Sequence, residues 1–211
     1  MKEYNKSKKS KDHGLSHRRK LLFEGNKGTG RTYTASVIAS ELNLPLYVVQ
    51  LDKLVQKYMG ETQSKLRQIF DSIDESDGVY LFDELDNFCI IDRNFLDDFM
   101  QFITQDFSNS IIIIITNNKK IIEESSLRTF DDILHFKMPT EEEIENIYAN
   151  KLSSFEDGFV ASRQLIFQSQ LLAHSEIVRV CDEVIKESVL NNQKISEARI
   201  LSLVKARVSQ F

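Results

Sequence analysis

A glycine-rich segment near the start of the chain has the spacing of a phosphate-binding loop. Residues 24–33 read EGNKGTGRTY, and three of the seven glycines in the chain lie within six positions here. Glycines after a strand let backbone N–H groups point at phosphate oxygens, and the helix that follows adds its positive end. The pattern G-x-x-x-x-G-K-[ST] is matched except that arginine replaces lysine. The segment predicts a nucleotide site formed by Gly25, Asn26, Lys27, Gly28, Thr29, Gly30, Arg31, Thr32 and Tyr33, and the alternative is a glycine-rich turn between a strand and a helix.

Two adjacent carboxylates follow a hydrophobic run of strand length. The segment VYLFDE ends in Asp83 and Glu84, downstream of Thr32. A carboxylate at the end of a buried strand beside a phosphate loop can hold Mg2+, and the next carboxylate can polarise a water for attack on a terminal phosphate. We therefore predict Thr32 and Asp83 as metal-binding residues and Glu84 as a catalytic base. The alternative is that both acids simply begin the next turn.

A third polar position follows the run IIIIITNN. Asn117, with Asn118 as the neighbouring candidate, could orient the attacking water or bind the terminal phosphate. Taken alone, Asn-Asn-Lys is typical of a turn. Its place along the chain, after the glycine loop and the paired acids, favours Asn117 as a catalytic residue.

Apolar runs that alternate with amphipathic segments must position these residues. Unbroken apolar runs with helices between them are typical of a parallel sheet covered on both faces. After about residue 150 the strand pattern ends and helical periodicity continues, which indicates a small helical subdomain. We expect a basic flexible leader (1–13), an α/β core (14–150) and a helical lid (151–211). The predicted strands are 20–24, 46–51, 78–84, 110–118 and 132–138, and the predicted core helices are 32–42, 62–75, 94–107 and one that starts at Pro139 and Thr140.

Composition restricts the class of protein. The chain has 211 residues, 41% of them hydrophobic, which is enough for one packed domain with a small appended one. Residues 1–20 carry a net charge of +6, so the chain total of −5 leaves −11 on the rest, and an acidic body argues against a broad nucleic-acid surface. No run approaches the ~18 apolar residues of a membrane span. Cys89 and Cys181 are expected to be free thiols, which favours a cytoplasmic location.

The order of the motifs resembles the AAA+ ATPases, particularly the branch that contains katanin, spastin and the proteasomal ATPases. The likeness covers about residues 14–205 and rests on several motifs in register. It implies a P-loop NTPase fold of the α/β class, with a parallel five-stranded sheet sandwiched by helices and a small C-terminal helical lid. It also implies ATP hydrolysis with Mg2+ in a ring, either a homo-oligomer or a hetero-oligomer with a related ATPase, that remodels a protein substrate.

The resemblance assigns further residues. Segment 51–70 is similar to the one that carries the first central-pore loop, so Tyr58 and Met59 would grip a threaded polypeptide. Segment 125–136 is similar to the one that supplies an arginine finger to the neighbouring subunit, which implies that role for Arg128. Segment 173–190 resembles the lid helix, which places His174 and Ser175 near the nucleotide.

Several departures from the family pattern indicate a compact, partly divergent member of bacterial type. Arg31 replaces the lysine, Thr129 stands where many relatives have a second arginine, and the span after Glu84 is short. The chain also starts close to its first core strand, so we expect no separate substrate-recognition domain. These departures leave open an alternative function, that of a switch or scaffold subunit that binds ATP with little or no hydrolysis. A nucleic-acid-handling ATPase is a third interpretation, based on the basic leader.

Overall fold

The computed structural model describes residues 18–51, 59–86, 93–106, 108–156 and 158–209. These residues form two compact units. The first contains the described part of Met1–Gly25 together with Arg31–His135, and the second contains Asn26–Gly30 and Phe136–Phe211.

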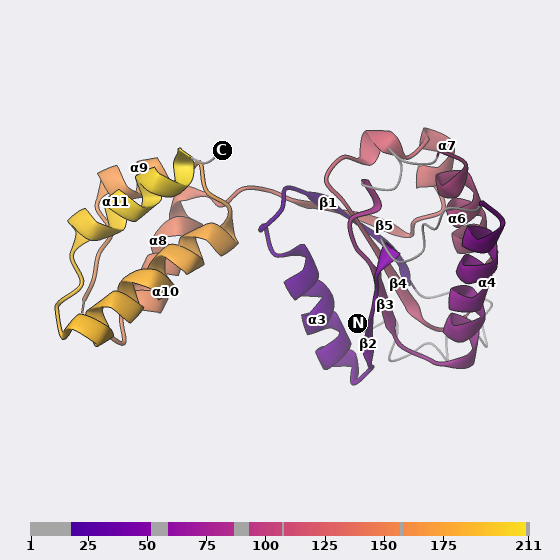
Figure 1. The fold of residues 1–211 in the computed structure, drawn as a ribbon, viewed down its shortest axis with the longest axis horizontal. Coiled ribbons are helices and arrows are strands. Elements are labelled where there is room, and N and C mark those ends of the chain that lie inside the picture. The colour runs from indigo at the N-terminus through magenta and orange to yellow at the C-terminus, as the bar shows by residue number, and fades with distance from the viewer. Residues whose placement is uncertain (1–17, 52–58, 87–92, 107, 157, 210–211) are drawn as a thin grey trace. The chain divides into compact units, whose positions relative to one another are not determined.

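A five-stranded parallel sheet forms the centre of the first unit, as predicted. Its strands lie in the order β2-β3-β4-β1-β5 (Figure 1). All six residues of β4 are buried, and four of β3 are, because each of these strands has neighbours on both sides and helices above and below. The strand bounds are β1 Lys20–Gly25, β2 Leu46–Val49, β3 Val79–Phe82, β4 Ile111–Thr116 and β5 Asp132–Phe136.

Helices cover both faces of this sheet. Helix α3 (Arg31–Leu42) lies on one face, and α4 (Met59–Glu75) and α6 (Arg93–Gln105) lie on the other (Figure 1). An aromatic cluster joins the second pair to the sheet, with Phe82 of β3 5.1 Å from Phe99 and 6.0 Å from Phe70 between ring centroids. A short 3-10 helix, η2 (Lys119–Ile121), and α7 (Glu124–Leu127) connect β4 to β5.

The second unit is helical. It contains α8 (Glu141–Leu152), α9 (Arg163–Ser169), α10 (His174–Asn191) and α11 (Glu197–Val208). Thr140 and Glu143 form a reciprocal capping box at the start of α8. Tyr148 is fully buried at the centre of this unit, where its hydroxyl bonds to Ser169 at 2.8 Å. Cys181 is a buried free thiol, and burial raises its pKa to about 12, so it is unreactive near neutral pH.

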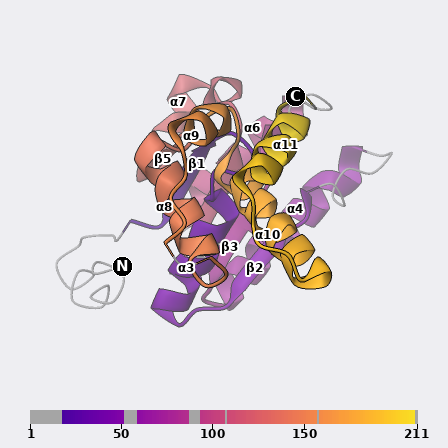
Figure 2. The ribbon, with the colours of Figure 1, turned by 90° about the vertical axis from the view of Figure 1, so that its left-hand side faces the viewer.

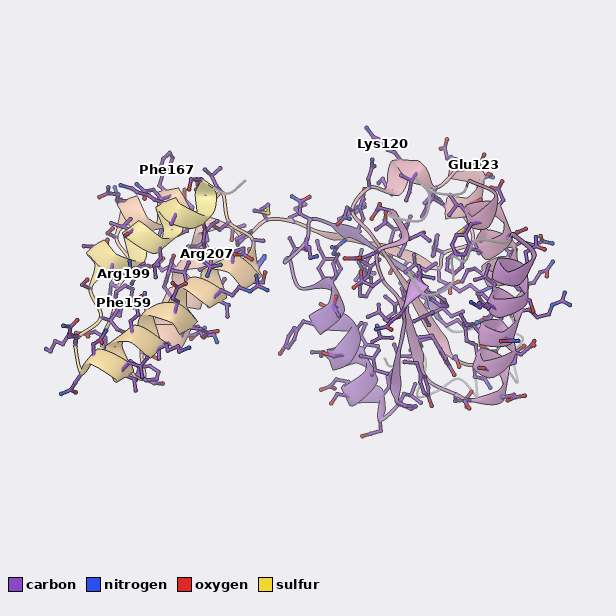
Figure 3. All side chains as sticks on the ribbon, viewed as in Figure 1. Lys120, Glu123, Phe159, Phe167, Arg199 and Arg207 are labelled. Atoms are coloured by element: carbon purple, nitrogen blue, oxygen red, sulfur yellow. The ribbon has the colours of Figure 1, made fainter. Side chains whose placement is uncertain are left out.

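Ion pairs close the seam between α10 and α11, which lie side by side (Figures 1 and 2). Figure 3 labels Arg199 and Arg207, both on α11. Arg199 binds Glu187 through two hydrogen bonds, and Arg207 binds Glu176 at 2.7 Å and Glu183 at 3.0 Å. The partner acids all lie on α10, so these ion pairs link the two helices.

Three expectations concern the limits of these units. In the described structure α8 packs on α10 and α9 of the second unit. The predicted domain boundary at residue 150 remains a prediction. The basic leader and Cys89 lie outside the described residues. None of the described helices is long and apolar enough to cross a membrane.

Candidate nucleotide-binding site

The parallel order of the central strands brings three predicted segments to one edge of the sheet. Strand β4 lies between β3 and β1, and the register pairs Phe82 with Ile114 and Glu24 with Thr116. Since parallel strands end on the same side, the ends of β3, β4 and β1 lie at one edge of the sheet. Ligands of open parallel sheets bind at this carboxyl edge.

Two oxygen ligands lie next to each other at this edge. Thr32, in the first turn of α3, directs its hydroxyl at Asp83 Oδ2, 3.3 Å away. A hydroxyl and a carboxylate are the hard oxygen ligands that Mg2+ prefers. Among the described residues no group of three or more His, Cys, Asp or Glu side chains could hold a metal by itself. The chemistry of a hydroxyl beside a carboxylate fits a cation that takes its other ligands from phosphate oxygens and water, as Mg2+ does in phosphate sites.

Glu84 has an unusual backbone conformation. Its φ is 59°, in the left-handed region, and its N–H donates to Asp83 Oδ1 at 2.8 Å. The other described non-glycine residues with positive φ are Asn43 and Asn192, and asparagine tolerates this region well. For glutamate the conformation costs on the order of 1 kcal/mol or more, and such strain is concentrated at functional sites. The exposed Glu84 side chain stands at the end of β3, where the predicted base was expected.

Asn117 is held by a residue that the sequence analysis missed, Asp86. One Asp86 oxygen accepts the Thr116 hydroxyl at 2.7 Å and the Asn118 N–H at 3.3 Å. The other accepts the Asn117 backbone N–H at 2.7 Å and its side-chain amide at 2.8 Å. Asn118, the second candidate, instead caps η2 by accepting from the Lys120 N–H. The only sequence signal for Asp86 was a third acid two residues after Glu84, in DELD.

Arg31 is buried, although it is the cation of the predicted phosphate loop. Its exposed fraction is 8%, and one guanidinium N–H donates to the Thr116 carbonyl at 2.9 Å. Burial lowers the pKa of the guanidinium below its usual value, and carboxylates oppose that shift in the order Asp83, Asp86 and Glu84. The guanidinium is therefore the counter-charge of the acidic segment after β3.

Gly28 and Gly30 of the loop belong to the second unit. The Gly28 carbonyl accepts the Ser175 N–H at 3.0 Å, at the start of α10. Gly28 has φ +86°, and a Cβ built on it would lie 2.4 Å from Ser175 Oγ and 3.1 Å from the Ala173 Cβ. Gly30 has φ +101°, but a Cβ there would meet nothing within 4 Å. Both glycines are therefore required by conformation, and Gly28 also by close packing.

His174 presents an unsatisfied polar atom at the start of α10. Its Nδ1 is buried and has no hydrogen-bond partner among the described residues, while its Nε2 lies 4.0 Å from Glu143 Oε2. A buried group without a partner costs about 1–3 kcal/mol. A ligand group that supplied the missing bond would fit this position, and the predicted nucleotide contact of His174 remains a prediction.

The remaining predicted residues have simpler surroundings. Arg128 is the exposed C-cap of α7, and Tyr33 is 74% exposed on α3. Met59 is the first residue of α4, and Tyr58 lies outside the described residues together with residues 52–57 of the expected pore segment. Figure 3 marks Lys120 and Glu123 on the segment between β4 and α7, which leads from Asn117 to Arg128.

Comparison with known proteins identifies the family. Residues 21–138, more than half of the chain, match the model of the ATPase family associated with various cellular activities (AAA). The chain belongs to this family. The matched range confirms the predicted family, and it contains the glycine loop, the acids after β3 and the segment with Asn117 and Arg128.

Curated AAA relatives are similar over different shares of their length. An uncharacterized AAA family ATPase, y4kL of Sinorhizobium fredii, is 30% identical over 210 residues, 94% of this chain and 63% of that protein. The AAA domain-containing protein ycf46 of Guillardia theta is 24% identical over 94% of this chain and 42% of its own length. The peroxisomal ATPase PEX6 of Saccharomyces cerevisiae is 28% identical over 60% of this chain and 14% of its own. The chain therefore spans less than two thirds of each of these relatives.

The glycine contacts give a matched pair of substitutions. Gly28→Ala should lower the free energy of unfolding by about 2 kcal/mol, since it adds a clash with Ser175 and Ala173 to backbone strain. Gly30→Ala should cost only the strain, about 1 kcal/mol. Urea unfolding followed by circular dichroism measures both. Ser175→Ala should recover part of the loss in Gly28→Ala, and equal losses for the two glycines would contradict the close packing.

Proposed function

We propose that this AAA protein binds ATP with Mg2+ and hydrolyses it slowly. The observation that carries the proposal is the group of residues at the carboxyl edge of the sheet: Thr32 beside Asp83, a strained Glu84, and Asn117 held close by. Family membership supports nucleotide binding and ATPase chemistry. We assign nucleotide binding and ATP hydrolysis to these residues of the chain.

Each residue takes a part in the proposed reaction according to its position. Mg2+, when bound, neutralises phosphate charge and holds the terminal phosphates in position. Thr32 and Asp83 supply oxygen ligands for it, and the loop from Gly25 to Gly30 supplies backbone N–H donors for phosphate oxygens. Glu84 takes a proton from the attacking water, and Asn117 orients that water. His174 contributes its free Nδ1 to the bound nucleotide.

Assembly into a ring that remodels a protein is the broader part of the proposal. It rests on AAA membership, on the exposure of Arg128 as an arginine finger, and on likeness to relatives such as PEX6, which is named a peroxisomal ATPase. Tyr58 and Met59 would contact the protein substrate. The alternative, a subunit that binds ATP but hardly hydrolyses it, is favoured by the burial of Arg31 against Thr116.

ATP turnover and binding test the proposed function directly. With MgATP at a hundred times its dissociation constant, binding should add roughly 2.7 kcal/mol of stability, seen as a rise in Tm. Glu84→Gln should keep this rise and lower kcat by about a hundredfold or more, because it loses the base and keeps the fold. Glu41→Gln, an exposed acid on α3, is the control and should change neither quantity. No rise in Tm with millimolar MgATP would reject the site.

Ring assembly predicts a change of mass and an effect of Arg128. Light scattering should show a larger particle with MgATP than without. Arg128→Ala should lower turnover by about a hundredfold while ATP affinity stays within threefold, because the finger acts on charge that develops during transfer. A monomer under both conditions, or equal losses of affinity and turnover, would refute an arginine finger that acts between subunits.

Arg31→Lys should raise kcat about tenfold, equal to roughly 1.4 kcal/mol off the barrier. A compact ammonium fits between terminal phosphates, whereas the guanidinium is longer, planar and bonded to the Thr116 carbonyl. Steady-state ATP turnover measures the change, and Arg67→Lys, an exposed arginine on α4, is the control. A parent chain that is inactive and remains inactive after Arg31→Lys would favour the non-hydrolysing subunit.

A further inference from the structure

The short loop that carries Asn117 connects β4 to η2 and spans residues 116–119. An amide that orients a water must itself be held in place, because a displacement of about 1 Å can cost a hundredfold in rate. Backbone pairing cannot hold this loop, since the strand ends at Thr116. A side chain of β1 and a side chain of the segment that follows β3 hold it instead.

Asp86, in the segment that follows β3, accepts four hydrogen bonds. They come from the Thr116 hydroxyl, the Asn117 backbone and side chain, and the Asn118 backbone. A carboxylate suits this position because it has acceptor sites on both oxygens and no donor. Hydrogen bonds to an ionised acceptor are also stronger than neutral ones. One side chain thus fixes both the path of the loop and the orientation of the Asn117 amide.

From the side of β1, Glu24 holds the other end of the loop. One of its oxygens accepts the Lys119 N–H at 3.3 Å, and the other lies 3.6 Å from Lys119 Nζ and 2.6 Å from His135 Nδ1. Glu24 pairs with Thr116 in the register of β1 and β4, and it is the residue immediately before Gly25. The loop is therefore fastened to the strand that leads into the phosphate-binding segment.

We propose that Asp86 and Glu24 are positioning residues, two carboxylates that clamp the loop of residues 116–119 so that Asn117 can orient the attacking water. This inference rests on the proposed ATPase function. It goes beyond that function because it assigns a role to two acids that need not contact nucleotide. Asp86 sets the Asn117 amide itself, and Glu24 fixes the far end of the loop.

The first test measures whether substitution of the clamping acids changes kcat or KM for ATP. Asp86→Ala removes all four acceptor contacts and should lower kcat about tenfold to a hundredfold with KM for ATP within threefold, because ground-state binding does not use this loop. Asp86→Asn, which has the same size, should cause a smaller loss in the same direction. Glu24→Ala should lower kcat less than Asp86→Ala, since it releases only the end of the loop. Asp97→Ala, an exposed acid on α6, is the control.

A double-mutant cycle then separates positioning from a direct role. If Asp86 acts through Asn117, the variant that combines Asp86→Ala with Asn117→Ala should be no slower than Asn117→Ala alone. Losses that multiply would mean that Asp86 acts independently of Asn117, and the clamp would be rejected. A rise in KM without a fall in kcat would reject it as well.

Hydrogen exchange provides a measurement that does not need activity. The Asn117 amide, bonded to Asp86 at 2.7 Å, should exchange about tenfold faster or more in Asp86→Ala, while amides of β2 should keep their rates. The Lys119 amide should respond in the same way to Glu24→Ala. Unchanged exchange in an active chain would overturn the clamp and leave the proposed function intact. No turnover in the parent chain, with exchange altered as expected, would overturn the proposed function and leave the loop contacts established.

Discussion

The buried end of β4 is the point on which the arrangement of the site depends. Thr116 is fully buried, and a polar group there loses about 1–3 kcal/mol if it has no partner. Its carbonyl is satisfied by Arg31 from α3 and its hydroxyl by Asp86 from the segment after β3. The two hydrogen bonds of Thr116 therefore bring together two charged side chains, Arg31 and Asp86, from separate elements. The other acids after β3 then lie where the guanidinium can balance them, and the acidic cluster is tolerated at the sheet edge.

The fold could be predicted from the sequence because its central strands are buried on both faces. Such strands consist of unbroken apolar residues, and 110–118 is the clearest example, with five consecutive isoleucines. Central and edge strands alike were predicted too long: β3 ends at Phe82 instead of 84, β4 at Thr116 instead of 118, β2 at Val49 instead of 51 and β5 at Phe136 instead of 138. An apolar or polar run in the sequence does not show where the last ladder hydrogen bond forms. The contact of Gly28 with Ser175 was beyond prediction, because it joins residues far apart in the chain.

Motif spacing predicted the kinds of side chain at the site better than their contacts. Thr32, Asp83 and Asn117 lie at the carboxyl edge of the sheet, where the Asn117 amide binds Asp86 and Asn118 caps η2, and their roles at a nucleotide remain predictions. The pattern could not reveal the left-handed backbone of Glu84. Nor could it reveal that Asp86 and Glu24 bind the loop between β4 and η2. A motif specifies residue types and not the hydrogen bonds that each residue makes.

The geometry of Arg31 relates its departure from the family pattern to the stability of the Asn117 loop. A guanidinium has five N–H donors in a rigid plane, and the bond to the Thr116 carbonyl uses one of them. An ammonium is a single point of charge, so a lysine that turned to a phosphate would leave that carbonyl without its donor. One N–H of an arginine guanidinium can stay bonded to the carbonyl at the end of the strand while its other N–H groups face an anion. The guanidinium then cannot approach the phosphate as closely as phosphoryl transfer requires. On the proposed function, the bond from Arg31 to the Thr116 carbonyl would therefore hold the end of β4 and keep the guanidinium from serving as a lysine would at the terminal phosphates.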